Sequence, residues 1–507
     1  MTTVELEVTS RPGAPSVASS DRGSNATAAL EGTGPLDFDV LIIGTGGAGV
    51  AAAIQAVGMG ARVGIVESGT LGGTCVNVGC IPSKNLVEAA SHYHSARRGF
   101  PGVAPCSPAL DWSALMTQKR ALVDELRLAK YADVLASYPG IALLQGHARL
   151  LGAGRVRVGA VEHRAKKVIL ATGTSPSLPP IPGLDRVGAL DSTSAMEQSQ
   201  LPSSLIVLGG SAVGLELGQT FARFGTRVVV LELQPRLLAQ EDATISEALR
   251  SALEQEGMEI HTSIETVGVE RDADGVVVRV REGSLAGTFR ADEILVATGR
   301  RANTGDLGLE DADVKLTERG YVQVDATMRS TSPDVYGAGD VTGGPGYVYV
   351  AAAGGRVAAE NAVRSLGPTT QSSDVPRELD LGTVPNVTFT SPQVGSVGLT
   401  ELAAREAGYN IQISTLDMAQ VPRAIVSYNS QGVIKMIAEA ESGRLLEIHA
   451  VSANAGEFMG EAALALRFGL TARDLAGTLH PYLTWVESLK LAAQGFSMDV
   501  SKLSCCA

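Results

Sequence analysis

The amino-acid sequence predicts an α/β fold that contains two Rossmann-like dinucleotide-binding units. Two glycine-rich turns, which begin at Gly44 and Gly209, each lie between a short β-rich run and a helical run. The chain has 507 residues, too many for a single hydrophobic core, so we expect two to four domains. Its 58 glycines and 45% hydrophobic residues are typical of an α/β enzyme and unlike a disordered or fibrous protein.

Charge and cysteine content exclude several classes of protein. The net charge is −13 and no block of Lys and Arg stands out, which argues against nucleic acid or an anionic membrane as a partner. The cysteines are too few and too clustered for a secreted disulfide framework, and they stand at positions 75, 80, 106, 505 and 506. We therefore expect a cytoplasmic protein whose thiols serve catalysis or metal handling.

The N-terminal segment carries no export signal. Residues 1–37 are rich in Ser, Ala, Gly and Thr and lack the apolar core of a signal peptide, so we predict a flexible tail. Residues 40–60 lack charge, but their glycines follow a strand–turn–helix pattern. That pattern favours the buried start of a βαβ unit over a membrane span.

The first glycine turn has the parts of a dinucleotide fingerprint. A predicted strand over residues 38–43 leads into the turn, and a helix is expected over residues 50–58. The next strand, 63–66, ends at Glu67, which can accept hydrogen bonds from ribose hydroxyls. Three glycines permit, in order, the tight turn, the approach of a pyrophosphate and close helix–strand packing: Gly44, Gly46 and Gly49.

The same pattern recurs further along the chain. A strand over residues 204–208 leads into a turn with Gly209 and Gly214, and Ser211 replaces the middle glycine. The following strand, 228–231, ends at Glu232, at the same distance from its first glycine as Glu67 has in the first unit. Two such units predict two dinucleotides, most simply a flavin and a nicotinamide.

Three further turns support a flavin. Two apolar strands, 168–170 and 294–296, each end in an Ala-Thr-Gly turn. A third turn closes on Gly339 and Asp340, whose carboxylate could accept from the ribityl hydroxyls of FAD. The two Ala-Thr-Gly turns consist of Ala171, Thr172 and Gly173, and of Ala297, Thr298 and Gly299.

A pair of cysteines forms the candidate redox centre. Cys75 and Cys80 are five residues apart, which on a regular helix would turn them away from each other, but Gly79 between them indicates a break. Pro82 suits the first turn of a following helix, whose N-terminus and Lys84 would favour a thiolate. A zinc site would require more ligands and closer cysteine spacing.

The segment from Gly72 to Lys84, the two glycine fingerprints and the turn at Asp340 resemble the pyridine nucleotide–disulfide oxidoreductases. The resemblance covers about residues 38 to 507. It implies two Rossmann-like domains plus an α+β C-terminal dimerisation domain. The domain ranges that we expect are a tail (1–37), an FAD domain in two parts (38–188 and 303–376), an NAD(P) domain (189–302) and a dimerisation domain (377–507).

The resemblance also implies roles for the site residues. Cys80 would lie against the flavin as the charge-transfer thiolate, Cys75 would be the exchanging thiol, and Lys84 would pair with Glu216 near the flavin. The expected cofactor-binding residues are Gly44, Gly46, Gly49, Glu67, Gly73, Thr74, Lys84, Ala171, Thr172, Gly173, Gly209, Gly214, Glu232, Gly299, Gly339 and Asp340.

The C-terminal region departs from the disulfide-reducing members of the family. Those members carry His-Pro-Thr-x-x-Glu, in which the histidine is an acid–base for the dithiol. Counting back from Glu487, Tyr482 takes the place of that histidine. His480 lies two residues earlier, and we expect a structural role for it while its use as a base stays open.

The C-terminal region resembles that of the branch of the family that reduces Hg(II). The resemblance lies in Tyr482 and in two neighbouring cysteines, Cys505 and Cys506. Reducing a soft metal ion needs thiolates that bind the ion and pass it on. The resemblance implies that Hg(II) arrives as a thiolate complex, passes from Cys505 and Cys506 of one subunit to Cys75 and Cys80 of the other in a homodimer, and is reduced by NADPH through FAD.

The chain differs from that branch in three places. No N-terminal metal-binding domain with a Cys pair is present, so we expect a form limited to the catalytic core. Ala189 and Leu190 stand where a second active-site tyrosine is expected. Glu232 suits the free ribose hydroxyls of NADH, whereas Arg236 could reach the 2′-phosphate of NADPH. The family resemblance implies NADPH, and NADH is kept as the alternative.

Two other functions are weighed against Hg(II) reduction. The first is a thiol–disulfide reductase of the same fold, like the thioredoxin reductases that end in a redox-active pair. Tyr482 in place of histidine argues against it. The second is a protein that only sequesters metal, which the two intact dinucleotide motifs make improbable.

Overall fold

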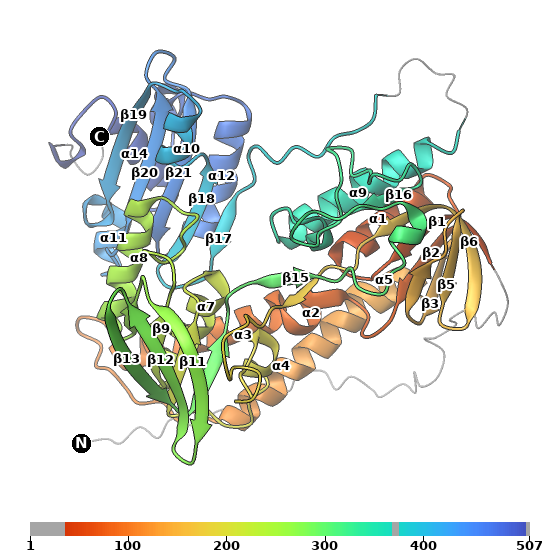
Figure 1. Cartoon of the computed structure of the whole chain (residues 1–507). Coiled ribbons are helices and arrows are strands. Elements are labelled where there is room, and N and C mark those ends of the chain that lie inside the picture. Colours follow the sequence, from red (N-terminus) through yellow and green to blue (C-terminus); the bar gives the residue numbers. More distant parts are fainter. Residues whose placement is uncertain (1–35, 368–374, 503–507) are drawn as a thin grey trace, which may run out of the picture.

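The computed structural model describes residues 36–367 and 375–502 (Figure 1). Residues 1–35 of the expected N-terminal tail (1–37) and the Cys505–Cys506 pair lie outside these residues, whereas Asp37, the last residue of the expected tail, begins the first strand. Three groups of strands organise the chain, and the two glycine turns each lie at the edge of a parallel sheet.

The first parallel sheet carries the first glycine turn. Its strand order is β3-β2-β1-β6, and β16 pairs with the end of β6. Helices α1 (Gly47–Gly58) and α9 (Val348–Arg364) lie against each other beside this sheet (Figure 1). The strands are β1 (Asp37–Ile43), β2 (Val63–Glu67), β3 (Ile141–Gln145), β6 (Val161–Leu170) and β16 (Val335–Gly337).

The second parallel sheet repeats this plan. Its order is β10-β9-β8-β14, and helices α7 (Ala212–Phe224) and α8 (Ala243–Gln255) follow its first two strands. The strands are β8 (Ser204–Leu208), β9 (Arg227–Leu231), β10 (Glu259–His261) and β14 (Glu293–Val296).

Antiparallel strands accompany each parallel sheet. In the first unit β4 (Ala148–Leu150) and β5 (Arg155–Val158) extend β6. A two-stranded sheet of β7 and β15 joins the first unit to the second. The strands of the second unit and of this connection are β11 (Glu265–Asp272), β12 (Gly275–Glu282), β13 (Leu285–Ala291), β7 (Thr174–Pro176) and β15 (Arg300–Ala302).

The C-terminal part is an antiparallel sheet of order β17-β18-β21-β20-β19 with helices against it. Phe458 and Leu489 are among the buried side chains between sheet and helices. The strands are β17 (Asn386–Thr388), β18 (Gln393–Gly398), β19 (Ile411–Asp417), β20 (Val433–Glu439) and β21 (Leu445–Ser452). The helices are α10 (Glu401–Glu406), α11 (Pro422–Val426), α12 (Ala455–Arg467), α13 (Ala472–Gly477) and α14 (Glu487–Gln494).

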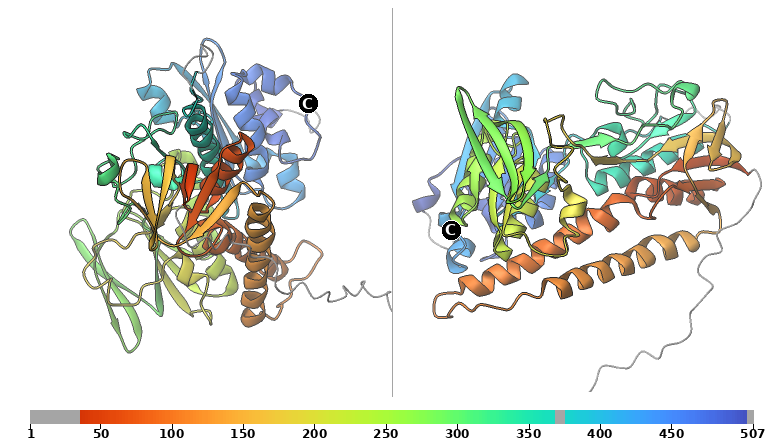
Figure 2. Two further views of the ribbon diagram at one scale, coloured as in Figure 1. Left: turned by 90° about the vertical axis from the view of Figure 1, so that its right-hand side faces the viewer. Right: turned by 60° about the horizontal axis from the view of Figure 1, so that its bottom comes forward.

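A set of helices links the first unit to the second. Helix α3 (Cys80–Arg98) packs on α7, and the long helix α4 (Trp112–Arg127) runs beside α3 (Figure 2). The remaining helices of this region are α2 (Gly73–Val78), the π-helical η1 (Leu128–Ala132), α5 (Asp133–Ala136) and α6 (Ser192–Ala195). Single 3₁₀ turns are η2 (Glu310–Ala312), η3 (Asp340–Thr342), η4 (Met418–Gln420) and η5 (Val500–Lys502).

The predicted fold class is confirmed: two Rossmann-like units are followed by an α+β part with an antiparallel sheet. The helix expected over residues 50–58 begins earlier, at Gly47, directly after Gly46, whose extended backbone makes it the N-cap residue. Among residues 36–367 and 375–502, no helix is both long and apolar enough to cross a membrane.

The third fingerprint glycine closes each turn for the same steric reason. A Cβ atom on Gly49 would lie 1.9 Å from the carbonyl oxygen of Gly44, and one on Gly214 would lie 2.1 Å from that of Gly209. Each helix therefore starts directly on the end of its strand. This contact fixes the helix N-terminus, with its free backbone N–H groups, above the edge of the sheet.

Gly49→Ala should destabilise the protein. The added methyl group has no room beside Gly44, and overpacking typically costs about 1–3 kcal/mol, so we expect the thermal midpoint to fall by about 2 °C or more. Gly58→Ala in the same helix is the matched control, because nothing lies within 4 Å of its Cβ position. Differential scanning calorimetry of both variants checks this, and equal midpoints for the two would contradict it.

Candidate functional site

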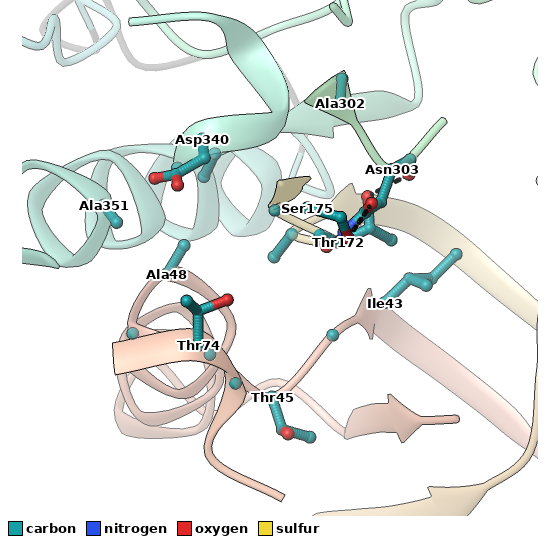
Figure 3. Close-up of a pocket in the computed structure, with 18 of the residues that line it drawn as sticks. Ile43, Thr45, Ala48, Thr74, Thr172, Ser175, Ala302, Asn303, Asp340 and Ala351 are labelled. Atoms are coloured by element: carbon teal, nitrogen blue, oxygen red, sulfur yellow. Dashed lines mark hydrogen bonds between the residues drawn. The ribbon is translucent and has the colours of Figure 1, made fainter. Parts of the chain in front are cut away.

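A cavity of about 490 Å³ lies along the carboxyl edge of the first parallel sheet. The first glycine turn forms its floor, and Cys75 and Cys80 lie along its wall. In Figure 3, Thr45 and Thr74 lie on one side of the open space and Asp340 lies on the other. The cavity therefore joins a helix N-terminus, a thiol pair and a carboxylate.

Glu67 lies at the end of β2, where the sequence predicted an acid. One of its carboxylate oxygens accepts from the Thr45 hydroxyl, and the other accepts from the Gly69 backbone N–H at 2.7 Å. The Thr45 hydroxyl in turn accepts from the Gly72 backbone N–H at 3.1 Å. The glycine turn, the acid and the start of the cysteine segment are thus joined in one hydrogen-bond network.

Asp340 is positioned from the other side of the cavity. Its Oδ2 accepts from the Thr174 hydroxyl at 3.0 Å, and that hydroxyl accepts from Arg300 Nε at 2.8 Å. Asn303 holds the same connection: its side-chain N–H donates to the Thr172 carbonyl at 2.9 Å, and its Oδ1 accepts from the Ser175 hydroxyl at 2.8 Å (Figure 3). The β7–β15 pair therefore fixes the residues opposite the glycine turn.

The residues present fit FAD. Gly46 and Gly73 lie so close that a Cβ on Gly73 would be 2.6 Å from Gly46 Cα, so side chains are excluded where a pyrophosphate approaches. A Cβ on Gly173 would meet no atom within 4 Å, because this residue borders the cavity. Glu67 at one end and Asp340 near the other supply acceptors for ribose and ribityl hydroxyls.

The two thiols come together because two helices meet at a break. Cys75 lies within α2, and Cys80 is the first residue of α3. Gly79 separates the helices, and a Cβ there would lie 2.9 Å from the Thr74 carbonyl oxygen. The predicted break is present at Gly79, and Asn77, inside α2, donates from its side chain to the carbonyls of Leu71 and Gly73.

The local charges make Cys80 the thiolate of the pair. A hydrogen bond from Cys75 lowers the pKa of Cys80 to about 7, and the Lys84 ammonium acts in the same direction against the effect of burial. The hydrogen bond to Cys80 and burial raise the pKa of Cys75. Cys80 also lies at the N-terminus of α3, which favours a thiolate.

Lys84 and Glu216 form the ion pair that the resemblance implied. Lys84 Nζ lies 2.6 Å from Glu216 Oε2, and Glu216 Oε1 accepts from the Phe389 backbone N–H at 2.8 Å. The Lys84 ammonium lies 4.8 Å from the centre of the Phe389 ring. The Glu216 side chain is 7% exposed, so this buried carboxylate has a charged partner and a backbone donor.

The second glycine turn has the same layout as the first. A Cβ on Gly209 would lie 2.6 Å from the Ala297 carbonyl, as Gly44 does beside Ala171 in the first unit. Glu232 follows β9 and accepts from backbone N–H groups. Gly299 has a positive φ, and nothing lies within 4 Å of its Cβ position.

Tyr482 and His480 differ in their surroundings. Tyr482 is 47% exposed. The His480 side chain is 3% exposed, with Nε2 at 2.7 Å from Glu461 Oε1 and Nδ1 at 3.1 Å from the Thr478 carbonyl. Both ring nitrogens of His480 are engaged within its own subunit, which favours the structural role expected for it.

Several polar residues of the site were missed by sequence reasoning. Thr45 lies inside the fingerprint, but the fingerprint pattern specifies only its glycines. Thr174, Arg300 and Asn303 are brought together by the pairing of β7 with β15, which no periodicity in the sequence predicts. Tyr131 lies in the π-helix η1 against Gly72, and burial followed by the nearby thiols Cys75 and Cys80 raises its pKa.

Two family models match the chain. Residues 38–355 match the pyridine nucleotide-disulphide oxidoreductase model, and residues 384–493 match the dimerisation domain of the same family. Together they cover both dinucleotide units and the antiparallel C-terminal part.

Relatives that match nearly the whole of this chain are mercuric reductases. The chain is 44% identical to the enzyme of Streptomyces lividans over 93% of this chain and 98% of that protein. It is 42% identical to the Bacillus cereus enzyme over 94% of this chain and 74% of that protein. It is 43% identical to the Shigella flexneri enzyme over 92% of this chain and 82% of that protein.

Solved structures of a disulfide reductase share the fold. The HOCl-induced flavoprotein disulfide reductase RclA of Escherichia coli superposes with a TM-score of 0.79 at 29% identity, over 90% of this chain and 99% of that chain. Its Cu(II) complex gives the same TM-score at 30% identity, with the same shares covered.

Cys75→Ala should raise the pKa of Cys80 from about 7, because it removes the hydrogen bond that contributes most to the thiolate. In the reduced holoenzyme, the rate of Cys80 alkylation by iodoacetamide rises with pH as the thiolate forms. The midpoint of this rise should lie at least about one pH unit higher in the variant than in the parent protein. Mass spectrometry of the Cys80 peptide measures this rate. Cys106→Ala, at an exposed cysteine outside the cavity, is the control. An unchanged Cys80 profile in Cys75→Ala would contradict the assignment.

Proposed function

Because this chain belongs to the pyridine nucleotide-disulphide oxidoreductase family, we propose that it is a flavoenzyme that reduces Hg(II) to elemental mercury with a reduced nicotinamide nucleotide. The observation that carries this proposal is the 41–44% identity to six mercuric reductases over nearly the whole chain. The overall reaction is Hg(II) + NAD(P)H → Hg(0) + NAD(P)⁺ + H⁺, in which one hydride equivalent supplies the two electrons.

The first unit would hold FAD, and the second would hold NADPH or NADH. FAD, when bound, supplies a two-electron relay between the nicotinamide and the thiol site. The FAD residues proposed from the structure are the first glycine turn, Glu67 and Asp340, all of which border the cavity. The domain limits given above, with the FAD domain interrupted by the NAD(P) domain, are part of the same proposal.

Cys75 and Cys80 would bind the substrate Hg(II). Thiolates are the ligands that this soft ion prefers, and each exchange replaces one sulfur ligand by another. Cys80, with a pKa of about 7, is about half thiolate at neutral pH. Cys75 must lose its proton when the ion binds, because its pKa is raised in the ion-free protein. Lys84, held by Glu216, keeps positive charge beside Cys80.

The delivery of Hg(II) and the assembly of the site are proposed from the sequence. Cys505 and Cys506, which lie outside the described residues, would take Hg(II) from thiolate complexes and pass it to the inner pair of the other subunit. The matching dimerisation domain supports a homodimer with shared active sites. Tyr482 would lie at this shared site, in a cytoplasmic enzyme.

A thiol–disulfide reductase is the second candidate, because RclA is a flavoprotein disulfide reductase with the same fold. Disulfide reduction releases a thiolate that benefits from an imidazole acid. Here Tyr482 stands where that imidazole is expected, and His480 is buried against Glu461. These observations favour the metal ion as substrate.

The proposal is tested by NAD(P)H oxidation in the holoenzyme, with Hg(II) supplied as its bis-cysteine complex under anaerobic conditions. We expect oxidation that depends on Hg(II), with release of Hg(0) vapour in equal amount. Glutathione disulfide and thioredoxin disulfide are the comparison substrates. Rapid turnover of either disulfide with none of Hg(II) would overturn the proposal in favour of the second candidate.

Replacing both Cys505 and Cys506 with Ala should lower turnover at least about tenfold when Hg(II) is presented as a bulky dithiol complex. The inner thiols cannot easily reach an ion shielded by such ligands, whereas Cys505 and Cys506 would exchange with these ligands first. The rate of flavin reduction by the nicotinamide should stay unchanged. Cys106→Ala serves as the matched control, and full turnover by the double variant would refute the delivery role.

A further inference from the structure

The second glycine turn presents a fixed carboxylate where the adenosine ribose of a nicotinamide nucleotide would lie. Glu232 directly follows β9 at the carboxyl edge of the second parallel sheet, next to the glycine turn between β8 and α7. Its Oε2 accepts from the Gly210 backbone N–H, and its Oε1 accepts from the Gln234 backbone N–H at 2.7 Å. Two backbone donors therefore hold the carboxylate in one orientation.

The first unit contains the same arrangement. Glu67 is the last residue of β2. It accepts on Oε2 from the Thr45 hydroxyl of the glycine turn, and on Oε1 from the N–H two residues later, that of Gly69, at 2.7 Å. Glu232 matches it in strand position, in the turn contact and in the contact two residues later. The chain thus places two equivalent acids at two equivalent nucleotide edges.

The first unit shows which kind of ribose such an acid accommodates. FAD, for which that cavity is proposed, carries an adenosine whose ribose has free hydroxyls and no 2′-phosphate. A carboxylate accepts hydrogen bonds from such hydroxyls but repels a phosphate dianion. Building on the proposed function, we propose that Glu232 makes this enzyme select NADH over NADPH.

The nearby basic residue does not offset this charge. Arg236 is the one Lys or Arg within residues 232–236, and its Nη2 donates to the Ala239 carbonyl at 3.0 Å. Its Nε is buried and has no partner among the described residues. The guanidinium is thus partly enclosed by its own loop, whereas the Glu232 carboxylate lies against the glycine turn, where Gly210 would place a Cβ 3.2 Å from its Oε2.

The size of the preference follows from the charges. Bringing like charges together at a binding site costs several kcal/mol, and each 1.4 kcal/mol is a factor of ten. We therefore expect NADH to be favoured about 100-fold in kcat/KM, and NAD⁺ to bind more tightly than NADP⁺ by a similar factor.

The test uses the holoenzyme in two measurements that need no mercury. Stopped-flow absorbance follows anaerobic flavin reduction by NADH and by NADPH, and calorimetry measures the Kd of NAD⁺ and NADP⁺. Preference for NADH and NAD⁺ in both supports the inference. Equal use of the two nucleotides, or preference for NADPH, overturns it. Hg(II)-dependent turnover, measured separately, decides the proposed function whichever nucleotide is preferred.

Variants assign the preference to a residue. Glu232→Gln keeps an acceptor for one of the two backbone N–H groups but removes the charge. It should therefore raise the rate of flavin reduction by NADPH at least tenfold relative to that by NADH, and the affinity for NADP⁺ at least tenfold relative to that for NAD⁺. Glu282→Gln, which removes the same charge from the exposed end of β12, is the matched control and should leave the ratio unchanged. Arg236→Ala should also leave it unchanged, and a selective loss of NADP⁺ binding there would overturn the inference. An unaltered preference between the two nucleotides in a folded, flavin-loaded Glu232→Gln variant would also overturn the inference.

Discussion

The ion pair between Lys84 and Glu216 is the contact on which the arrangement of the site depends. Lys84 comes from α3, Glu216 from α7 of the second unit, and Phe389, which donates its N–H to Glu216, from the C-terminal part. A nearly buried carboxylate is costly unless it is paired and hydrogen-bonded. Satisfying Glu216 therefore requires all three parts of the chain to meet at one point.

That junction also sets the chemistry of the thiols. Lys84 lies four residues after Cys80, one turn along the same face of α3, so fixing the ammonium fixes a positive charge beside the sulfur. Lys84 lowers the pKa of Cys80, whereas Glu216 raises it, and the hydrogen bond from Cys75 contributes most to the thiolate. A pKa near 7 for Cys80 results from these opposing effects, whereas the pKa of Cys75 is raised. Near neutral pH, Cys80 therefore forms a thiolate while Cys75 keeps its proton.

The sequence was sufficient for the elements whose reason is local. Strand, glycine turn, helix and terminal acid follow one another in each unit, so Glu67 and Glu232 could be placed by counting. The Lys84–Glu216 pair came from family resemblance, because two helices far apart in sequence carry it and no spacing reveals it. Helix α2 was not foreseen, since its six residues are too short to show a period. Asn303 was missed because its role arises from strand pairing.

The two units diverge at the middle position of the fingerprint, and they also differ in what lies against that position. In the first unit Gly73, two residues before Cys75, lies against Gly46: a Cβ on Gly73 would be 2.6 Å from Gly46 Cα, whereas a Cβ on Gly46 would lie 3.8 Å from Gly73 Cα. In the second unit Ser211 occupies the equivalent position and is exposed, with its hydroxyl donating to the Ala297 carbonyl at 3.1 Å. The thiol segment thus covers the first turn, whereas the second turn is exposed at Ser211. A covered turn suits a flavin retained through every cycle, and an open turn suits a nicotinamide nucleotide that must leave after each one.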